Sequence, residues 1–85
     1  MNMPSPGAAA LLARLEAIFR EVLEDETIHI DAGMKPGDLP GWDSFSNVSI
    51  LLACEQVWQF QFSSAQIDAI RSVADLVRTI DEKLR

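Results

Sequence analysis

Apolar residues in the first quarter of the chain recur at three- and four-residue spacing, which is the period of one helix face. They are Leu11 or Leu12, Leu15, Ile18 or Phe19, Val22 and Leu23. Ser5 followed by Pro6 is typical of a helix start, because serine can cap free N–H groups and proline needs no hydrogen bond there. The pattern predicts an amphipathic helix of roughly five turns that starts at this pair. Residues 1–6 are expected to include a flexible N-terminus.

The helical period disappears from about Glu26 to Asp43. This segment instead gathers the residue types that break helices and form turns. They are Gly33, Pro36, Gly37, Pro40 and Gly41. We therefore expect a long loop, tied to the core by Ile28, Ile30 and Leu39.

A second helix is predicted from Ser44 to Trp58 or Gln59, and its apolar residues form two stripes. Leu51, Cys54 and Trp58 lie along one stripe, and Val48 and Leu52 lie along the other. A helix in a small bundle needs only one apolar stripe to face the core. The second stripe is therefore either a docking surface for a partner or additional core.

Two more helices are predicted by their starts. Ser63 with Gln66, and Ser72 with Asp75, have the spacing of a capping box. The apolar stripe of the last helix consists of Val73, Leu76, Val77, Ile80 and Leu84. The predicted fold class is all-α, a small four-helix bundle of three longer helices and one short helix, with a long loop between helices 1 and 2. Residues 1–85 are expected to form a single domain.

Composition narrows the function. Thirteen acids against seven bases give a net charge of −6, so nucleic acid and anionic membranes are poor partners. The longest apolar run, Ile50 to Cys54, is too short to span a bilayer, and the N-terminus lacks a charged leader, so a cytoplasmic protein without membrane insertion is expected. Cys54, the single cysteine, is interpreted as a core residue. His29 has no neighbouring ligand residues, which predicts no metal site and no catalytic pair.

The strongest chemical signal is the Asp43–Ser44 pair, which ends the predicted loop and begins the second helix. A serine there can hold its hydroxyl in solvent at the positive end of the helix, where an attached phosphate would be stabilised. Taken alone, such a pair is an ordinary N-cap. Asp43 is interpreted as the cap, and it can also contact an enzyme that modifies Ser44.

This segment resembles the acyl carrier protein family. The family has an Asp-Ser-Leu sequence at the start of its second helix, usually preceded by a leucine and a glycine. Leu39, Gly41, Asp43, Ser44 and Phe45 stand in those places here. The resemblance continues through Glu55, Trp58, Phe60, Phe62 and residues 72–76, and it covers about residues 8–84.

The resemblance implies that Ser44 carries 4′-phosphopantetheine, attached covalently from coenzyme A by a phosphopantetheinyl transferase. The protein would be a free-standing, monomeric carrier and not an enzyme, and it would hold an acyl group as a thioester. Its other partners would be acyl- or aminoacyl-activating and transferring enzymes. The expected partner-binding residues are Asp43, Phe45, Val48, Leu52 and Glu55.

The second helix departs from the family's fatty-acid members, which are rich in acids there. Its outward positions include Ser46, Ser49 and Gln56 instead. We therefore expect a specialised biosynthetic pathway, for a polyketide, a lipid or a surface polysaccharide, rather than general fatty-acid synthesis. Two alternatives remain open. One is an aminoacyl or peptidyl carrier, and the other is an unmodified helical interaction domain in which Asp43 is only a cap.

Overall fold

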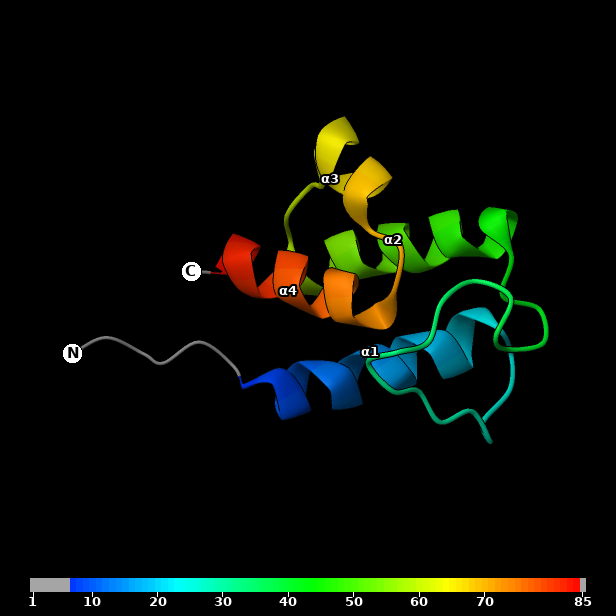
Figure 1. Cartoon of the computed structure of the whole chain (residues 1–85). Coiled ribbons are helices and arrows are strands. Elements are labelled where there is room, and N and C mark those ends of the chain that lie inside the picture. The colour runs from blue at the N-terminus through cyan, green and yellow to red at the C-terminus, as the bar shows by residue number, and fades with distance from the viewer. Residues whose placement is uncertain (1–6, 85) are drawn as a thin grey trace.

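Four helices make up the computed structural model, which describes residues 7–84. They are α1 (Ala8–Val22), α2 (Ser44–Trp58), α3 (Ser64–Ala69) and α4 (Val73–Leu84). Helices α2 and α4 both pack on α1. In the view of Figure 1, the short α3 lies above α2, and α1 lies below it. The predicted all-α fold of three longer helices and one short helix is confirmed, as is the long loop between the first two. None of the helices in residues 7–84 is long and apolar enough to cross a membrane.

The first helix is shorter than its sequence pattern predicts. Gly7 has an extended conformation and is the N-cap, so α1 begins at Ala8, and Ser5, Pro6 and the rest of residues 1–6 lie outside the described chain. The predicted start at Ser5–Pro6 is therefore wrong. Glycine loses more conformational freedom than other residues on entering a helix, which favours a start after Gly7. The helix has 15 residues, which is about four turns.

A Schellman turn ends α1. Glu24 has a φ of 54°, in the left-handed region. The Asp25 N–H donates to the Arg20 carbonyl at 3.0 Å, and the Glu24 N–H donates to the Glu21 carbonyl at 3.3 Å. These bonds satisfy carbonyls that the helix end leaves free, and they reverse the chain into the loop.

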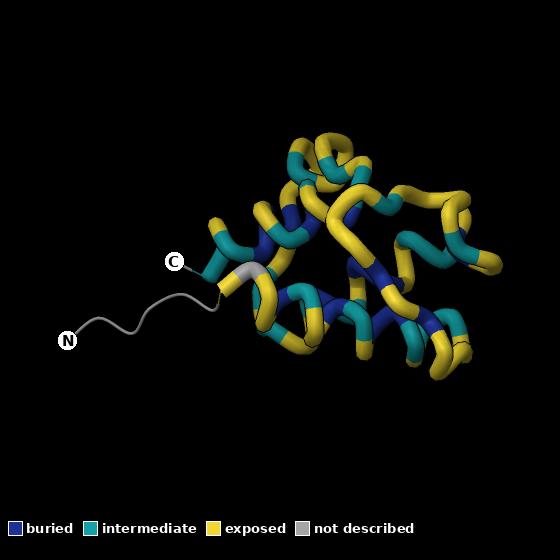
Figure 2. Tube along the Cα trace, turned by 60° about the horizontal axis from the view of Figure 1, so that its bottom comes forward, coloured by how far each residue is buried: buried dark blue, intermediate teal, exposed yellow. Residues whose placement is uncertain are grey.

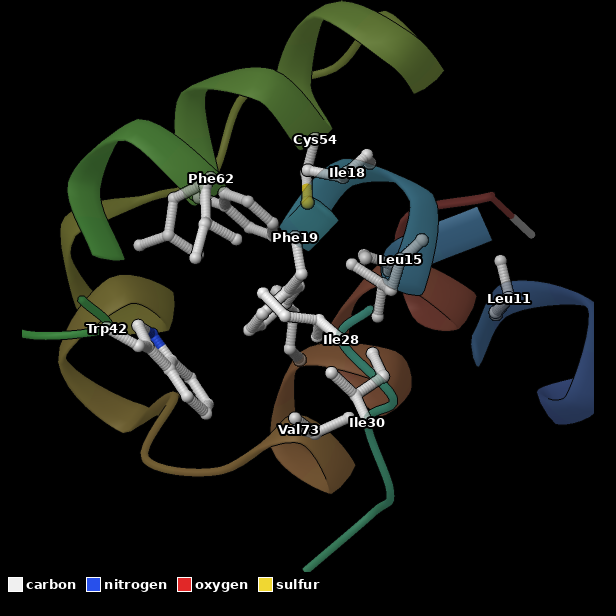
Figure 3. Close-up of a cluster of buried hydrophobic side chains, with 14 residues drawn as sticks. Leu11, Leu15, Ile18, Phe19, Ile28, Ile30, Trp42, Cys54, Phe62 and Val73 are labelled. Carbon is white, nitrogen blue, oxygen red and sulfur yellow. The ribbon is translucent and has the colours of Figure 1, made fainter. Parts of the chain in front are cut away.

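The buried residues come from α1, the loop, α2, the segment between α2 and α3, and α4 (Figures 2 and 3). The core consists of Leu11, Leu15, Ile18, Phe19, Ile28, Ile30, Trp42, Ile50, Leu51, Cys54, Phe62, Val73, Leu76 and Ile80. Ile28 and Ile30 are fully in the core and Leu39 packs partly against it, so the predicted loop anchors are confirmed. Sequence pattern alone did not single out Ile50, which has 0% exposure.

Hydrogen bonds fix the long loop on both sides. On the α1 side, Arg20 Nε donates to the Ile28 carbonyl at 2.8 Å, and the Ile30 N–H donates to Glu16 Oε2 at 3.0 Å. At the start of α4, the Val73 N–H donates to the Met34 carbonyl at 2.9 Å. The loop thus supplies an acceptor that a helix N-terminus otherwise lacks.

The two predicted capping sites both form. At α3, Ser63 Oγ accepts from the Gln66 N–H at 3.1 Å and Gln66 Oε1 accepts from the Ser63 N–H at 2.8 Å, which completes a capping box. At α4, Ser72 Oγ accepts from the Asp75 N–H at 3.1 Å. The predicted stripe of α4 faces the core, with three of its residues buried and two partly buried.

Candidate functional site

Ser44 is the first residue of α2 and is exposed to solvent. Within residues 7–84, its hydroxyl makes no hydrogen bond to the protein. The segment before it is not helical. The serine oxygen is therefore accessible to another molecule at the positive end of a 15-residue helix.

Asp43 caps α2, as its position predicts. Its Oδ1 accepts from the Phe45 N–H at 3.0 Å and from the Ser46 N–H at 2.9 Å. The hydrogen bond from the Ser46 N–H is the main cause that lowers the pKa of this carboxyl below its ordinary value. Asp43 is consequently ionised at neutral pH, and two of the first N–H groups of α2 are already satisfied.

Ser46 completes the capping box. Its Oγ accepts from the Asp43 N–H at 3.0 Å and lies 2.7 Å from the Gly41 carbonyl oxygen, to which it donates. Sequence reasoning missed this role, because a capping box usually has Glu or Gln at this position. The three-residue spacing between Asp43 and Ser46 was the sequence signal that could have indicated this role.

Trp42 anchors the loop just before the site. Its side chain is 3% exposed, and its ring meets that of Phe19 edge to face, with centroids 4.8 Å apart (Figure 3). The indole Nε1 donates to Asn47 Oδ1 on α2 at 3.0 Å. Trp42 is thus a packing anchor with a polar edge.

The second stripe of α2 faces solvent and does not belong to the core. Phe45, Val48 and Leu52 are 84%, 55% and 53% exposed, and we call them the apolar stripe. Leu51 and Cys54 on the opposite side are buried, and Trp58 is partly buried. The apolar stripe begins next to Ser44 and continues for two turns of the helix.

Glu55 is the single charged residue of α2. Its Oε2 accepts from the Phe62 N–H at 2.7 Å, and its backbone carbonyl accepts from the Phe60 N–H at 3.2 Å. The side chain therefore holds the segment that leaves α2. The expected role of Glu55 in partner binding stays a prediction.

His29 and Cys54, the other two residues considered for chemistry, take no part in the Ser44 site. The His29 side chain is 83% exposed and stands 3.7 Å from Glu16 Oε2 on α1. Burial, with a smaller contribution from Glu55, raises the pKa of the Cys54 thiol to about 12. Across residues 7–84, no three His, Cys, Asp or Glu side chains are grouped to hold a metal ion.

Comparison with solved structures finds a close similarity. The chain matches the solution NMR structure of a holo acyl carrier protein from Geobacter metallireducens with a TM-score of 0.80 and 28% sequence identity, over 96% of this chain and 87% of the other. No family model and no curated protein sequence matches the chain. The match extends over all four helices and the long loop. This similarity confirms the predicted resemblance to the acyl carrier protein family, in its all-helical fold and over nearly the whole chain.

Proposed function

We propose that this chain is a single carrier domain that bears 4′-phosphopantetheine on Ser44 and holds an acyl group on it as a thioester. The observation that carries the proposal is the exposed Ser44 hydroxyl at the first residue of α2, which makes no hydrogen bond within residues 7–84. The similarity to a holo acyl carrier protein supports it.

The attachment step uses Ser44 as a nucleophile. Ser44 Oγ forms a bond to the pantetheine-bearing phosphorus of coenzyme A, the phosphoanhydride bond breaks, and adenosine 3′,5′-bisphosphate leaves. A separate transferase takes the hydroxyl proton and supplies Mg²⁺, because within residues 7–84 Ser44 Oγ has no hydrogen bond to a base and the neighbouring Asp43 carboxylate already accepts from two N–H groups. Once attached, the arm supplies the thiol that forms thioesters.

The chain's own residues contribute position and recognition. The N-terminus of α2 favours the negative phosphodiester by roughly 0.3–1 kcal/mol. The apolar stripe beside Ser44 is the docking surface for the transferase and for the acyl-activating and transferring enzymes, with Asp43 and Glu55 at its margins.

The pathway is a specialised one, for a polyketide, a lipid or a surface polysaccharide. The supporting observation is that Glu55 is the only charge on α2 and already accepts the Phe62 N–H. A partner enzyme with a basic surface is attracted to an acidic helix. It gains little from a helix with one charged residue. The same observation also fits an aminoacyl or peptidyl carrier, which is the second candidate.

Incubation with coenzyme A and a broad-specificity phosphopantetheinyl transferase tests the proposal. Intact-mass spectrometry should show the gain of one arm in the wild type and none in Ser44→Ala. Ser49→Ala is the matched control, because Ser49 is an exposed serine on the same helix and should not affect the gain. A folded wild-type chain that gains no mass would leave the unmodified interaction domain as the better description.

Loading assays then separate the two carrier classes. The modified chain is offered to acyl-activating and to amino-acid-activating enzymes, and the thioester is identified by mass. An acyl thioester supports the first candidate, and an aminoacyl thioester supports the second. Partner binding that is the same in Ser44→Ala and in modified wild type would instead favour the unmodified domain.

A further inference from the structure

Two side chains of the first turn of α2 reach back across Ser44 to the loop. Ser46 Oγ donates to the Gly41 carbonyl at 2.7 Å. Asn47 Oδ1 accepts from Trp42 Nε1 at 3.0 Å. Ser44 therefore lies between two points at which the helix is tied to the segment that precedes it.

The bond from Ser46 to Gly41 is the more informative of the two. The Ser46 hydroxyl has one hydrogen, and of the acceptors near it the Gly41 carbonyl is the nearest, while Asp43 Oδ1 and the Asp43 carbonyl lie at 3.3 and 3.4 Å. A capping box requires only that this oxygen accept from the Asp43 N–H. The donated bond is an addition to the cap, and it joins α2 to the loop.

The backbone at Gly41 gains from this hydrogen bond, which we call the tie, because glycine itself restricts φ little. Its φ is +82°, in a region that glycine enters freely. Without the bond from Ser46, the turn at residues 39–42 would be held by the Trp42 N–H on the Leu39 carbonyl at 3.1 Å, by the Gly37 N–H on the Trp42 carbonyl at 2.8 Å and by the buried indole, none of which binds the Gly41 carbonyl. The Ser46 hydroxyl thus fixes the backbone three residues before Ser44.

We propose that Ser46 is a positioning residue for the attachment of the arm to Ser44, acting through its hydrogen bond to the Gly41 carbonyl. This inference rests on the proposed function. This bond keeps the backbone before Ser44 in one conformation, so the docked chain brings Ser44 to the transferase from a fixed backbone position. Misplacing a reacting group by about 1 Å can cost up to ~100-fold in rate.

Three substitutions at Ser46 separate the tie from the cap. Ser46→Ala removes both bonds. In Ser46→Asp, a carboxylate can still accept from the Asp43 N–H as in a capping box, but it has no hydrogen to donate to the Gly41 carbonyl. Ser46→Thr keeps the hydroxyl and both bonds.

Gln66→Ala is the matched control. Gln66 occupies the same position in the capping box of α3, where its Oε1 accepts from the Ser63 N–H at 2.8 Å. Its loss weakens a cap of the same kind in a helix that does not carry Ser44. Any effect on the measured rate that comes only from a lower overall stability should therefore appear in this variant as well.

The measurement is the steady-state rate of modification by the transferase with coenzyme A, with the unfolding midpoint of each variant recorded alongside. We expect kcat to fall about tenfold in Ser46→Ala and Ser46→Asp, with KM for the chain little changed. Ser46→Thr and Gln66→Ala should keep the wild-type kcat. Amide exchange at Trp42 should be faster in the two slow variants and unchanged in the threonine variant.

The outcomes distinguish this inference from the proposed function. A wild-type chain that is never modified contradicts the proposed function and, with it, the role given to Ser46. A wild-type chain that is modified, with an equal kcat in Ser46→Ala, overturns the inference alone. A normal kcat in Ser46→Asp together with a low one in Ser46→Ala also overturns it, because the cap without the tie would then suffice.

Discussion

Cys54 shows how burial sets the reactivity of one residue. Its side chain has 0% exposure, and burial raises the pKa of its thiol to about 12. The reactive form of cysteine is the thiolate, which is almost absent at neutral pH when the pKa is this high. Cys54 therefore behaves as a small apolar core residue.

The thiol of the proposed arm should consequently be the only fast-reacting thiol of the folded protein. We expect a thiol reagent at pH 7 to label the modified chain once and to leave the unmodified chain unlabelled until denaturant is added. Cys54→Ala serves as the control, since the modified form of this variant should still be labelled once. Rapid labelling of the folded, unmodified wild type would contradict the burial of Cys54.

Asp43 makes the stability of the folded chain depend on acid pH. Hydrogen bonds from N–H groups lower the pKa of Asp43, and the pKa values of Asp25 and Asp75 are lowered as well, chiefly by the Thr27 hydroxyl and by the Arg71 N–H. A carboxyl whose pKa is lower in the folded chain adds stability above its unfolded pKa of about 3.9. This stability is lost as the pH falls through the lower, folded value.

The unfolding midpoint should therefore fall as the pH is lowered from about 4. In Asp43→Asn this fall should be shallower, because asparagine can still cap α2 but does not titrate. Thermal unfolding followed by circular dichroism between about pH 2 and 6 measures both curves. Parallel curves for the two proteins would show that the Asp43 cap does not contribute to the acid sensitivity.

The loop between α1 and α2 depends on the backbone of Gly41. A residue with a Cβ at a φ of +82° is strained even where space is available, and the nearest atom to such a Cβ is Leu23 Cδ2 at 4.0 Å. We expect Gly41→Ala to lower the free energy of unfolding by about 1–2 kcal/mol, as measured by urea denaturation. Gly33→Ala is the control, since no positive φ is found at Gly33. Equal losses of unfolding free energy in both variants would contradict the explanation by the positive φ of Gly41.

Helix bounds were predictable where local signals agree. The helix from Ser44 to Trp58 was predicted correctly because Asp43 is a strong cap and the apolar pattern stops where Gln59 takes a left-handed φ of 57°. The start of α1 was wrong because Ser5–Pro6 offers a cap by sequence, whereas the helix starts after Gly7 without a side-chain cap. Local sequence does not decide well between two helix starts that lie within a few residues of each other.

Contacts between distant residues were not predictable in the same way. The position of Ser44 follows from the sequence because it depends on the cap beside it. The bonds from Ser46 to Gly41 and from Glu55 to Phe62 depend on how a loop folds back on α2. Likewise, periodicity gave two apolar stripes on α2, and only packing on α1 decides which of them is buried.

At the scale of the molecule, charge and apolar surface are separated. The chain has thirteen acids, but only Glu55 lies on α2. Helix α2 carries Ser44 at one end and the apolar stripe along its exposed side. A partner that docks along this helix therefore meets an apolar surface whose charges are confined to the Asp43 cap and to Glu55.

This separation predicts how the transferase recognises the chain. Removing part of an exposed apolar side chain leaves the core intact but reduces the area that docking can bury, at ~25 cal/mol per Å². We expect Leu52→Ser to raise the KM of the transferase for the chain about fivefold, with kcat unchanged, because apolar contact made equally before and during reaction acts on KM. Val57→Ser is the matched control, since Val57 is 38% exposed on α2 but lies outside the apolar stripe.

The salt dependence of KM provides a second test of the same prediction. Raising the ionic strength from about 0.05 M to about 0.5 M screens charge pairs strongly but affects apolar contact little. The KM for the wild-type chain should therefore change by less than about threefold, and the difference between Leu52→Ser and wild type should persist at high salt. A KM that rises steeply with salt and does not respond to Leu52→Ser would assign recognition to charged residues outside the apolar stripe instead.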